Sequence, residues 1–203
     1  PGLREEKTAA RQIEALGFAR SDVRHVVVTH LDVDHAGGLP DFPDAAVHVH
    51  RREQEAALRP PTRGERGRYR PPHLAHGPKW ALHEEGGDRW LGFERVKALG
   101  DDVALVPLFG HTRGHCAVAV RAPEGSGAEW LLHCGDAYFF HGEVEDPPSC
   151  PLGLRLFQRL MAIDDEARRA NVARLRELRR EHGARVRVFS AHSAVEYRAL
   201  RGS

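Results

Sequence analysis

The segment His30–His35 concentrates side chains that can bind a metal ion. It reads His-Leu-Asp-Val-Asp-His, so four imidazole or carboxylate groups fall within six residues. Side chains alternate along an extended chain, so those of residues 30, 32 and 34 can point the same way. The glycines at 37 and 38 give the backbone freedom to turn His35 toward them. Imidazole and carboxylate together suit zinc, iron or manganese. A loop that only caps a helix is the alternative.

Three further segments could complete such a site, and each follows a predicted strand. They are the turn Gly110–His115, the pair Gly135-Asp136 and the sequence Ser190-Ala191-His192. Within the turn, His115 is expected to be the ligand and His111 to stabilise the turn. Each segment is a weak signal alone, but loops at strand ends are where a rigid sheet can hold ligand atoms together.

Hydrophobic spacing predicts the elements that would position these residues. Apolar residues at helical spacing predict helices, and short β-branched runs predict strands. The expected helices span residues 3–16, 51–58, 155–161 and 164–182, and Asp164 or Asp165 is expected to cap the last one. The expected strands span 23–29, 46–50, 103–108, 116–121, 130–134 and 186–189. Because these elements interleave without an internal repeat, they predict one α/β or layered α+β domain over residues 1–203.

Composition narrows the classes of function. The chain has 30 basic and 29 acidic residues and a net charge of +1, so the basic excess typical of nucleic-acid-binding proteins is absent. Segment 59–72 holds five arginines, which leaves a nucleic-acid contact open beside the alternative of a surface loop. No apolar run approaches the roughly 20 residues of a membrane span. Three cysteines without a C-x-x-C pair favour a cytoplasmic location.

Taken together, the four segments resemble the metallo-β-lactamase superfamily. The matching stretches follow the family's order with family-like gaps, and they are Thr29–Gly38, Gly110–His115, Gly135–Phe139 and Ser190–Ser193. The resemblance implies an α+β fold, a four-layer αββα sandwich. The family normally begins with several β-strands before its first helix, whereas this chain opens at that helix. The expected fold therefore lacks the usual N-terminal strands.

The resemblance also implies a site for two divalent metal ions, with zinc expected. By position, His30, Asp32 and His115 would hold the first ion. The second ion would be held by Asp34, His35 and His192, and Asp136 would bridge both. Most members have histidine where this chain has Asp32. A carboxylate is a harder ligand that adds negative charge, so iron or manganese also suits the first position.

The chemistry implied by the resemblance is hydrolysis of a small ester, lactone or thioester by a hydroxide that two metal ions activate. Asp34 is expected to orient the hydroxide or carry a proton besides binding metal. Tyr138 is the second catalytic candidate, as a donor to the oxyanion, although lactonases of the superfamily place a tyrosine one residue later. A tyrosine packed in the core is the alternative reading of Tyr138.

The expected function is thus that of a metal-dependent hydrolase acting on a small molecule, with a lactone or carboxylic ester as the first choice. A di-iron redox protein and a nucleic-acid-processing enzyme are the alternatives from other classes. Neither nucleic acid nor a membrane is expected as a partner, and formation of a homodimer is left open.

Overall fold

The computed structural model describes residues 4–201, and within them the strands form two sheets. The first sheet is parallel, in the order β1-β2-β3, and its strands are β1 (His25–Val27), β2 (Ala46–His50) and β3 (Lys79–His83). The second sheet has the order β4-β5-β6-β7-β8-β9. Its strands are β4 (Asp88–Trp90), β5 (Phe93–Leu99), β6 (Val103–Pro107), β7 (Cys116–Arg121), β8 (Trp130–His133) and β9 (Val186–Phe189).

Strand direction in the second sheet brings several loops to one edge. Strand β7 runs antiparallel to both β6 and β8, and β9 runs parallel to β8. Strands β6, β8 and β9 therefore share a direction, and the loops that follow them meet at the same edge of the sheet. These loops contain the predicted site residues of the second half of the chain.

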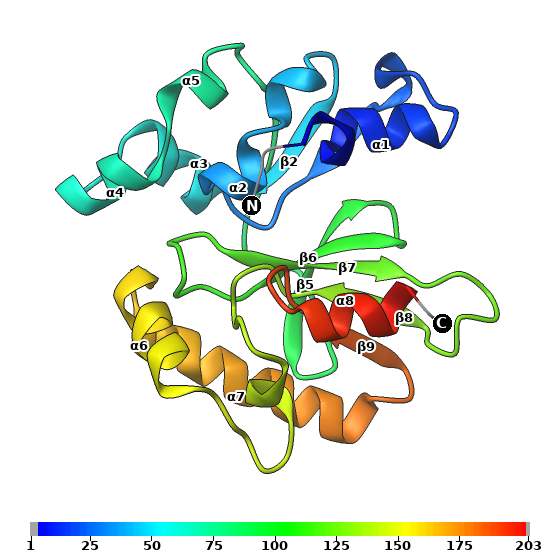
Figure 1. The fold of residues 1–203 in the computed structure, drawn as a ribbon, viewed down its shortest axis with the longest axis vertical. Coiled ribbons are helices and arrows are strands. Elements are labelled where there is room, and N and C mark those ends of the chain that lie inside the picture. Colours follow the sequence, from blue (N-terminus) through cyan, green and yellow to red (C-terminus); the bar gives the residue numbers. More distant parts are fainter. Residues whose placement is uncertain (1–3, 202–203) are drawn as a thin grey trace.

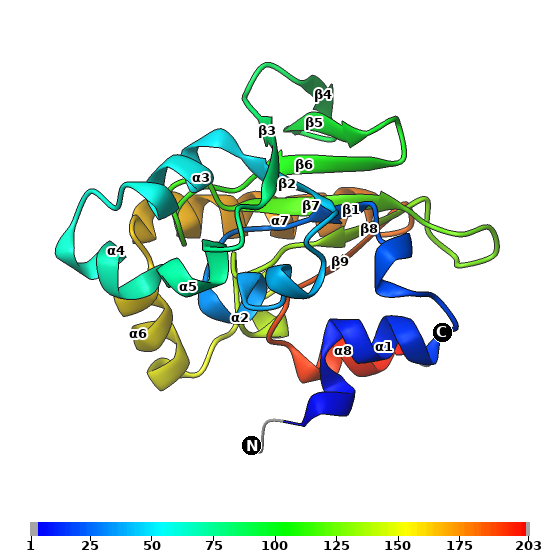
Figure 2. The same cartoon turned by 90° about the horizontal axis from the view of Figure 1, so that it is seen from above.

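Helices cover the outer faces of the two sheets. They are α1 (Ala9–Ala15), α2 (Val33–Ala36), α3 (Arg51–Leu58), α4 (Arg63–Arg68), α5 (Pro71–Leu74), α6 (Leu152–Met161), α7 (Asp165–His182) and α8 (Ala194–Arg201). Figure 1 shows α1–α5 on the side of the first sheet and α6 and α7 beneath the second. Seen from above in Figure 2, α4, α5 and α6 lie toward one end of the molecule. This layering confirms the predicted α+β class.

The interior strands have the composition that burial on both faces requires. Strand β6 reads Val-Ala-Leu-Val-Pro and β7 begins Cys-Ala-Val-Ala, and most of these side chains are buried. Short continuous apolar runs of this kind are typical of strands covered on both sides. Helix α7 packs Val172, Leu175 and Leu178 against one face, in a core cluster that includes Trp130 and Val186.

Helix boundaries follow local capping signals. Asp164 caps α7 as predicted, because its Oδ1 accepts a hydrogen bond of 2.9 Å from the Ala167 N–H. At the N-terminus the predicted helix 3–16 is shorter in the structure. Helix α1 begins after Thr8, whose Oγ1 accepts from the Arg11 N–H, and Leu3 lies outside the described residues.

The arginine-rich segment 59–72 differs from its prediction as a loop, since it contains α4 and the start of α5. Thr62 caps α4 by accepting a hydrogen bond of 3.2 Å from the Glu65 N–H. The buried Glu65 carboxylate also accepts two hydrogen bonds from Arg113 of a distant turn. A tertiary ion pair thus supports a helix whose glycines and arginines suggested a loop.

Residues 4–201 contain no candidate for a membrane-spanning helix. None of their helices combines the length and the apolar composition that a bilayer span requires.

Replacement of a core leucine should test the packing of α7 on the second sheet. Leu175 is 0% exposed, so Leu175→Ala should lower the free energy of unfolding by about 2–5 kcal/mol through lost contacts and a residual cavity. The exposed Leu152 (71%) serves as the control, since Leu152→Ala should cost no more than about 0.5 kcal/mol. Urea denaturation measures both, and equal losses would contradict the packing.

Candidate metal centre

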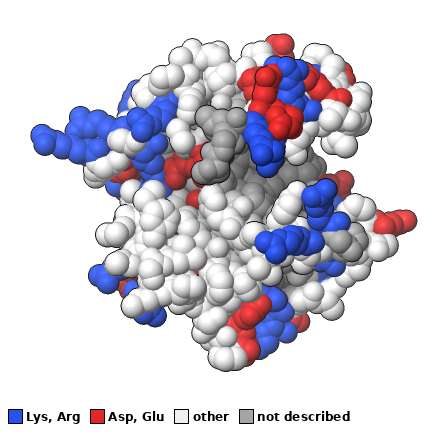
Figure 3. All heavy atoms as spheres, in the orientation of Figure 1, with Lys and Arg blue, Asp and Glu red and all other residues white. Residues whose placement is uncertain are grey.

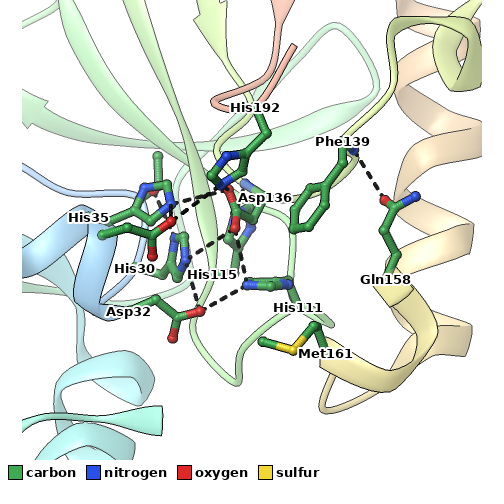
Figure 4. A network of polar contacts seen from close by, with 12 residues as sticks. His30, Asp32, His35, His111, His115, Asp136, Phe139, Gln158, Met161 and His192 are labelled. Atoms are coloured by element: carbon green, nitrogen blue, oxygen red, sulfur yellow. Dashed lines mark hydrogen bonds and ion pairs between the residues drawn. The ribbon is translucent and has the colours of Figure 1, made fainter. Parts of the chain in front are cut away.

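A first group of metal-binding side chains lies buried between the two sheets. It consists of His30, Asp32, His111 and Asp136, whose nearest ligand atoms lie within 4.8 Å of one another. His30 Nε2 is 3.4 Å from Asp32 Oδ2 and 3.9 Å from Asp136 Oδ2. His111 Nε2 is 3.1 Å from Asp32 Oδ2 and 3.4 Å from Asp136 Oδ2. Figure 4 shows these side chains converging from separate segments.

A second group lies beside the first and closer to the surface. It consists of Asp34, His35 and His192. Asp34 Oδ2 is 3.6 Å from His35 Nε2 and 3.4 Å from His192 Nε2. Asp136 faces this group as well, because its Oδ1 lies 3.2 Å from His35 Nε2 and 3.3 Å from His192 Nε2. The two oxygens of Asp136 therefore face different groups.

The spacing of these atoms suits metal coordination. Ligand atoms about 2.0–2.1 Å from a tetrahedral zinc are separated from each other by about 3.4 Å. The separations between histidine nitrogens and aspartate oxygens in the two groups run from 3.1 to 3.9 Å. Three buried atoms of these two groups also lack a hydrogen-bond partner among the described residues: His30 Nε2, His35 Nε2 and Asp136 Oδ1. Because unpaired buried polar atoms are costly, their convergence supports metal binding.

Asp32 does not serve as a helix cap. It occupies the N-cap position of α2, but its carboxylate makes no capping hydrogen bond. The carboxylate points into the first group instead, where Figure 4 shows it opposite His111. The helix-cap interpretation of the His30–His35 segment is therefore wrong for this side chain.

The electrostatics of the two groups favour ionised carboxylates. Burial by itself would raise the pKa of Asp32, but contacts with His111, His30 and Arg68 hold that pKa far below its usual range. Burial also opposes ionisation of Asp136, and its contacts with His192 and His35 likewise lower its pKa. In return, the close contact with the Asp136 carboxylate raises the pKa of His192.

Comparison with protein families decides the classification. The family model described as the metallo-beta-lactamase superfamily matches residues 1–181. The chain belongs to the metallo-β-lactamase superfamily.

Individual relatives within the superfamily include hydrolases. The chain is 44% identical over 204 residues to a protein of Mycobacterium tuberculosis named a probable metallo-hydrolase, which covers 99% of this chain and 64% of that protein. It is 34% identical over 141 residues to the N-acyl homoserine lactonase AttM of Rhizobium johnstonii, which covers 68% of this chain and 50% of that one. The chain thus spans 64% of the length of its mycobacterial relative.

Solved structures share the fold. An N-acyl homoserine lactone hydrolase with the product N-hexanoyl-L-homoserine at its catalytic metal center superposes with a TM-score of 0.73. The sequence identity is 20%, and the match covers 98% of this chain and 67% of the other. At this identity the likeness shows that the metallo-β-lactamase fold is common to both.

The two histidines of the Gly110–His115 turn have the opposite roles to those predicted. His111, expected to stabilise the turn, supplies Nε2 to the first group. His115, expected to be a ligand, donates from Nδ1 to the Leu108 carbonyl (3.1 Å) and accepts at Nε2 from the Asp136 N–H (3.0 Å). Since both of its ring nitrogens have protein partners, the assignment of His115 as a ligand is corrected to His111.

His115 instead positions the backbone of Asp136, and a glycine makes this contact possible. Gly135 has a φ of +50°, and a Cβ at this position would lie 2.7 Å from His115 Nε2. Burial lowers the pKa of His115 well below its usual value, so the ring stays neutral and keeps one donor and one acceptor. This superfamily member therefore uses His115 to support the loop that carries Asp136.

Tyr138 does not fulfil its predicted catalytic role. Its side chain is fully buried in the core, and its hydroxyl donates a hydrogen bond of 2.9 Å to Glu196 of α8. The neighbouring residue points into the site instead. The centroid of the Phe139 ring lies 4.9 Å from that of His192 and 6.0 Å from that of His111. Figure 4 shows this ring directed toward the ligand groups. No hydroxyl from this segment is available to an oxyanion.

A buried glutamate that the sequence did not reveal joins the ligand-bearing loops. Glu53 of α3 is 0% exposed, and its carboxylate accepts hydrogen bonds of 3.0 Å from both the Leu31 and the Gly114 backbone N–H. The Tyr69 hydroxyl donates to it as well. One carboxylate thus connects the His30–His35 loop to the turn of His111. A glutamate near the start of a polar helix carries no sequence signal for such a role.

Two variants should separate the roles of the turn histidines. His111→Ala should lower the metal bound per chain by more than His115→Ala does, because it removes a ligand atom. His115→Ala leaves the buried Asp136 N–H without its acceptor and should lower the free energy of unfolding by about 1–3 kcal/mol. Elemental analysis after dialysis and urea denaturation give the two readouts. The reverse pattern would restore the original assignment.

Neutralising Glu53 should loosen the junction between the loops. In Glu53→Gln one acceptor oxygen becomes an NH2 group that faces a backbone donor, so stability should fall by about 1–3 kcal/mol. Glu55→Gln, on an exposed residue of the same helix, is the matched control and should stay within about 0.5 kcal/mol of the unmodified protein. Equal stability of the two variants would show that the Glu53 carboxylate is dispensable.

Proposed function

We propose that this protein is a metallo-hydrolase that cleaves a small ester, lactone or thioester with two divalent metal ions, zinc being the expected metal. The observation that carries the proposal is the two-sided contact of Asp136. Its Oδ2 faces His30 and His111, and its Oδ1 faces His35 and His192. A carboxylate shared in this way suits two neighbouring ions. The hydrolase names of the relatives agree with this proposal.

The chain's own residues divide between the two positions. The first ion would be held by His30, Asp32 and His111, the second by Asp34, His35 and His192, with Asp136 common to both. When bound, two such ions polarise a substrate oxygen and lower the pKa of water toward neutrality. The protein's contribution is to hold these imidazoles and carboxylates together in a largely desolvated place.

Asp34 is the residue best placed to handle a proton. It belongs to the second group, yet its side chain is 55% exposed, whereas the carboxylates of Asp32 and Asp136 are nearly buried. A carboxylate at the mouth of the site can accept a hydrogen bond from the attacking water and receive its proton. The Phe139 ring, whose centroid lies 4.9 Å from that of His192, helps to exclude other water.

The space beside the first group suits a small, partly apolar substrate. A cavity of about 440 Å³ opens at Asp32 and Asp34 and is walled by Arg68 and by the apolar side chains of Leu160, Met161 and Ile163. Helix α6 continues this wall with Leu152 and Leu156, both exposed. We infer that the uncharged part of the substrate lies along this face while its reacting carbonyl meets the metal site.

The surface charges favour a small molecule over nucleic acid. Figure 3 shows basic side chains gathered over α4, whereas the surface over α6 is mostly neither basic nor acidic. The net charge of +1 adds no general attraction for a polyanion. Formation of a homodimer stays a prediction. A cytoplasmic location is proposed because Cys116, Cys134 and Cys150 are all free thiols.

Hydrolysis by the zinc-loaded protein is the direct test. The unmodified chain should cleave at least one of an N-acyl homoserine lactone, a p-nitrophenyl ester and an acyl thioester. Asp136→Ala should reduce that activity by more than about 100-fold and lower the metal content, because it removes the shared ligand. The exposed Asp102→Ala is the control and should match the unmodified protein.

Other outcomes would favour other functions. Activity and full metal content in Asp136→Ala would refute the proposed site. Purification with iron, a visible absorption band and no hydrolysis would favour a di-iron redox protein, which the hard carboxylate ligand of Asp32 also suits. Salt-sensitive binding of RNA would favour a nuclease.

A further inference from the structure

Arg68 is an arginine that turns away from solvent toward the first group. Its Nε donates a hydrogen bond of 2.5 Å to Asp32 Oδ1, and its Nη2 donates one of 2.8 Å to Asp32 Oδ2. Its Nη1 donates to the carbonyl of Met161, the last residue of α6 (2.7 Å). The guanidinium is therefore fixed by a bidentate ion pair and by a third contact. Its side chain is 9% exposed, unlike those of the exposed Arg66 and Arg70 nearby.

The same guanidinium also contacts His111. Arg68 Nη2 lies 2.7 Å from His111 Nε2. A guanidinium can only donate hydrogen bonds, so in this shorter contact His111 accepts through the lone pair of Nε2 and carries its proton on Nδ1. Asp32 Oδ2, which lies 3.1 Å from the same nitrogen, then receives its hydrogen bond from Arg68 Nη2 and not from His111. Burial lowers the pKa of His111, which agrees with a neutral ring. An imidazole nitrogen has one lone pair in the ring plane, and a metal ion would need that same lone pair.

Arg68 Nη2 thus bonds two atoms that the proposed first metal position requires, namely Asp32 Oδ2 and His111 Nε2. A divalent ion bound to these atoms would also lie close to a guanidinium of the same sign of charge. Repulsion between like charges at such short range is strong where water is excluded.

We propose that Arg68 is a built-in cation that competes with the first metal ion for Asp32 and His111. This inference rests on the proposed function. Arg68 stabilises the carboxylate and the imidazole in the metal-free protein, and it gives up His111 when the ion binds. The first position therefore binds metal more weakly than the second, whose ligands Asp34, His35 and His192 form no ion pair with an arginine among residues 4–201. The two positions fill in order, and full loading depends on the supply of free metal.

Arginine is the side chain that this role demands. Its planar fork bonds both oxygens of Asp32 and still reaches the Met161 carbonyl, which a single ammonium group could not do with the same geometry. The contact also gives one of the five arginines of segment 59–72 a structural role that does not involve nucleic acid. It joins α4 to the end of α6, the two elements that wall the cavity beside the first group.

Zinc titration of the metal-free protein tests the competition. The unmodified chain should show two binding steps of unequal affinity, followed with a chromophoric chelator as competitor. In Arg68→Met the weaker step should tighten by at least about tenfold, because the competing cation is gone. The melting temperature of the metal-free variant should fall, since Asp32 loses its partner, and zinc should raise that temperature by more than it does in the unmodified protein.

Arg70→Met is the matched control. Arg70 lines the same cavity and carries the same charge, but it is exposed and forms no hydrogen bond or ion pair with Asp32 or His111. Both its zinc affinities and its melting temperature should match those of the unmodified protein. Arg68→Gln, which removes the charge but keeps a donor, repeats the test should Arg68→Met fail to fold without metal.

Different results would contradict the competition by Arg68 and the proposed metallo-hydrolase function. A zinc affinity in Arg68→Met and Arg68→Gln that is unchanged or weaker would overturn the competition alone, because a purely structural or supporting arginine predicts that result. An equal tightening in Arg70→Met would also overturn it, since the effect would then be general charge removal. A wild-type protein that binds no zinc at all would contradict the proposed function and the inference together.

Discussion

Burial of ionisable side chains between the two sheets is the constraint on which this structure depends. His30, His115 and Asp136 are almost completely removed from water, and each such group needs partners to offset its lost hydration. The fold supplies them one by one. Thr29 Oγ1 contacts His30 Nδ1, and the Leu108 carbonyl and Asp136 N–H occupy the two nitrogens of His115. Within these groups, His30 Nε2 and Asp136 Oδ1 are left without a hydrogen-bond partner, and both belong to the candidate metal centre.

The backbone loops that carry these groups are themselves held by a buried charge. Glu53 accepts from Leu31 on one side and from Gly114 on the other, so a single carboxylate joins loops that come from different sheets. A Cβ on Gly114 would lie 2.2 Å from the Glu53 backbone nitrogen, which leaves no room for another residue there. The positions of the metal-binding side chains thus depend on the hydrogen bonds that hold their loops, as well as on the side chains themselves.

The replacement of an imidazole by Asp32 has consequences beyond the choice of metal. A carboxylate in this position adds negative charge to a group that already contains Asp136, and Arg68 balances that charge. The Asp32–Arg68 pair has no net charge, as a neutral histidine would have none. The arginine also anchors α4 against α6, so the electrostatics of the metal group and the shape of the adjoining cavity are set by the same contact.

Much of the fold and of the ligand set could be predicted because the signals are local. Segments 46–50, 51–58, 116–121 and 186–189 form the expected strands and helix, since apolar pattern and length decide such elements within a few residues. Likewise, ligand-type residues placed directly after strands fall together at a sheet edge. His30, Asp32, His35, Asp136 and His192 are brought close in this way, and Asp34 joins them.

Other features were decided only by the tertiary structure. His111 and His115 stand in one glycine-flanked turn, and only the path of that turn determines which ring faces Asp136 as a ligand and which supports its backbone. Packing likewise decides that Tyr138 points into the core, where it bonds Glu196, and that Phe139 points toward His192 in the site. By itself, the sequence determined which side chains could bind a metal and where strands would present them. The direction of each side chain in a turn, and the distant partners Glu53 and Arg68, depend on packing between segments far apart in the chain, which no local pattern records.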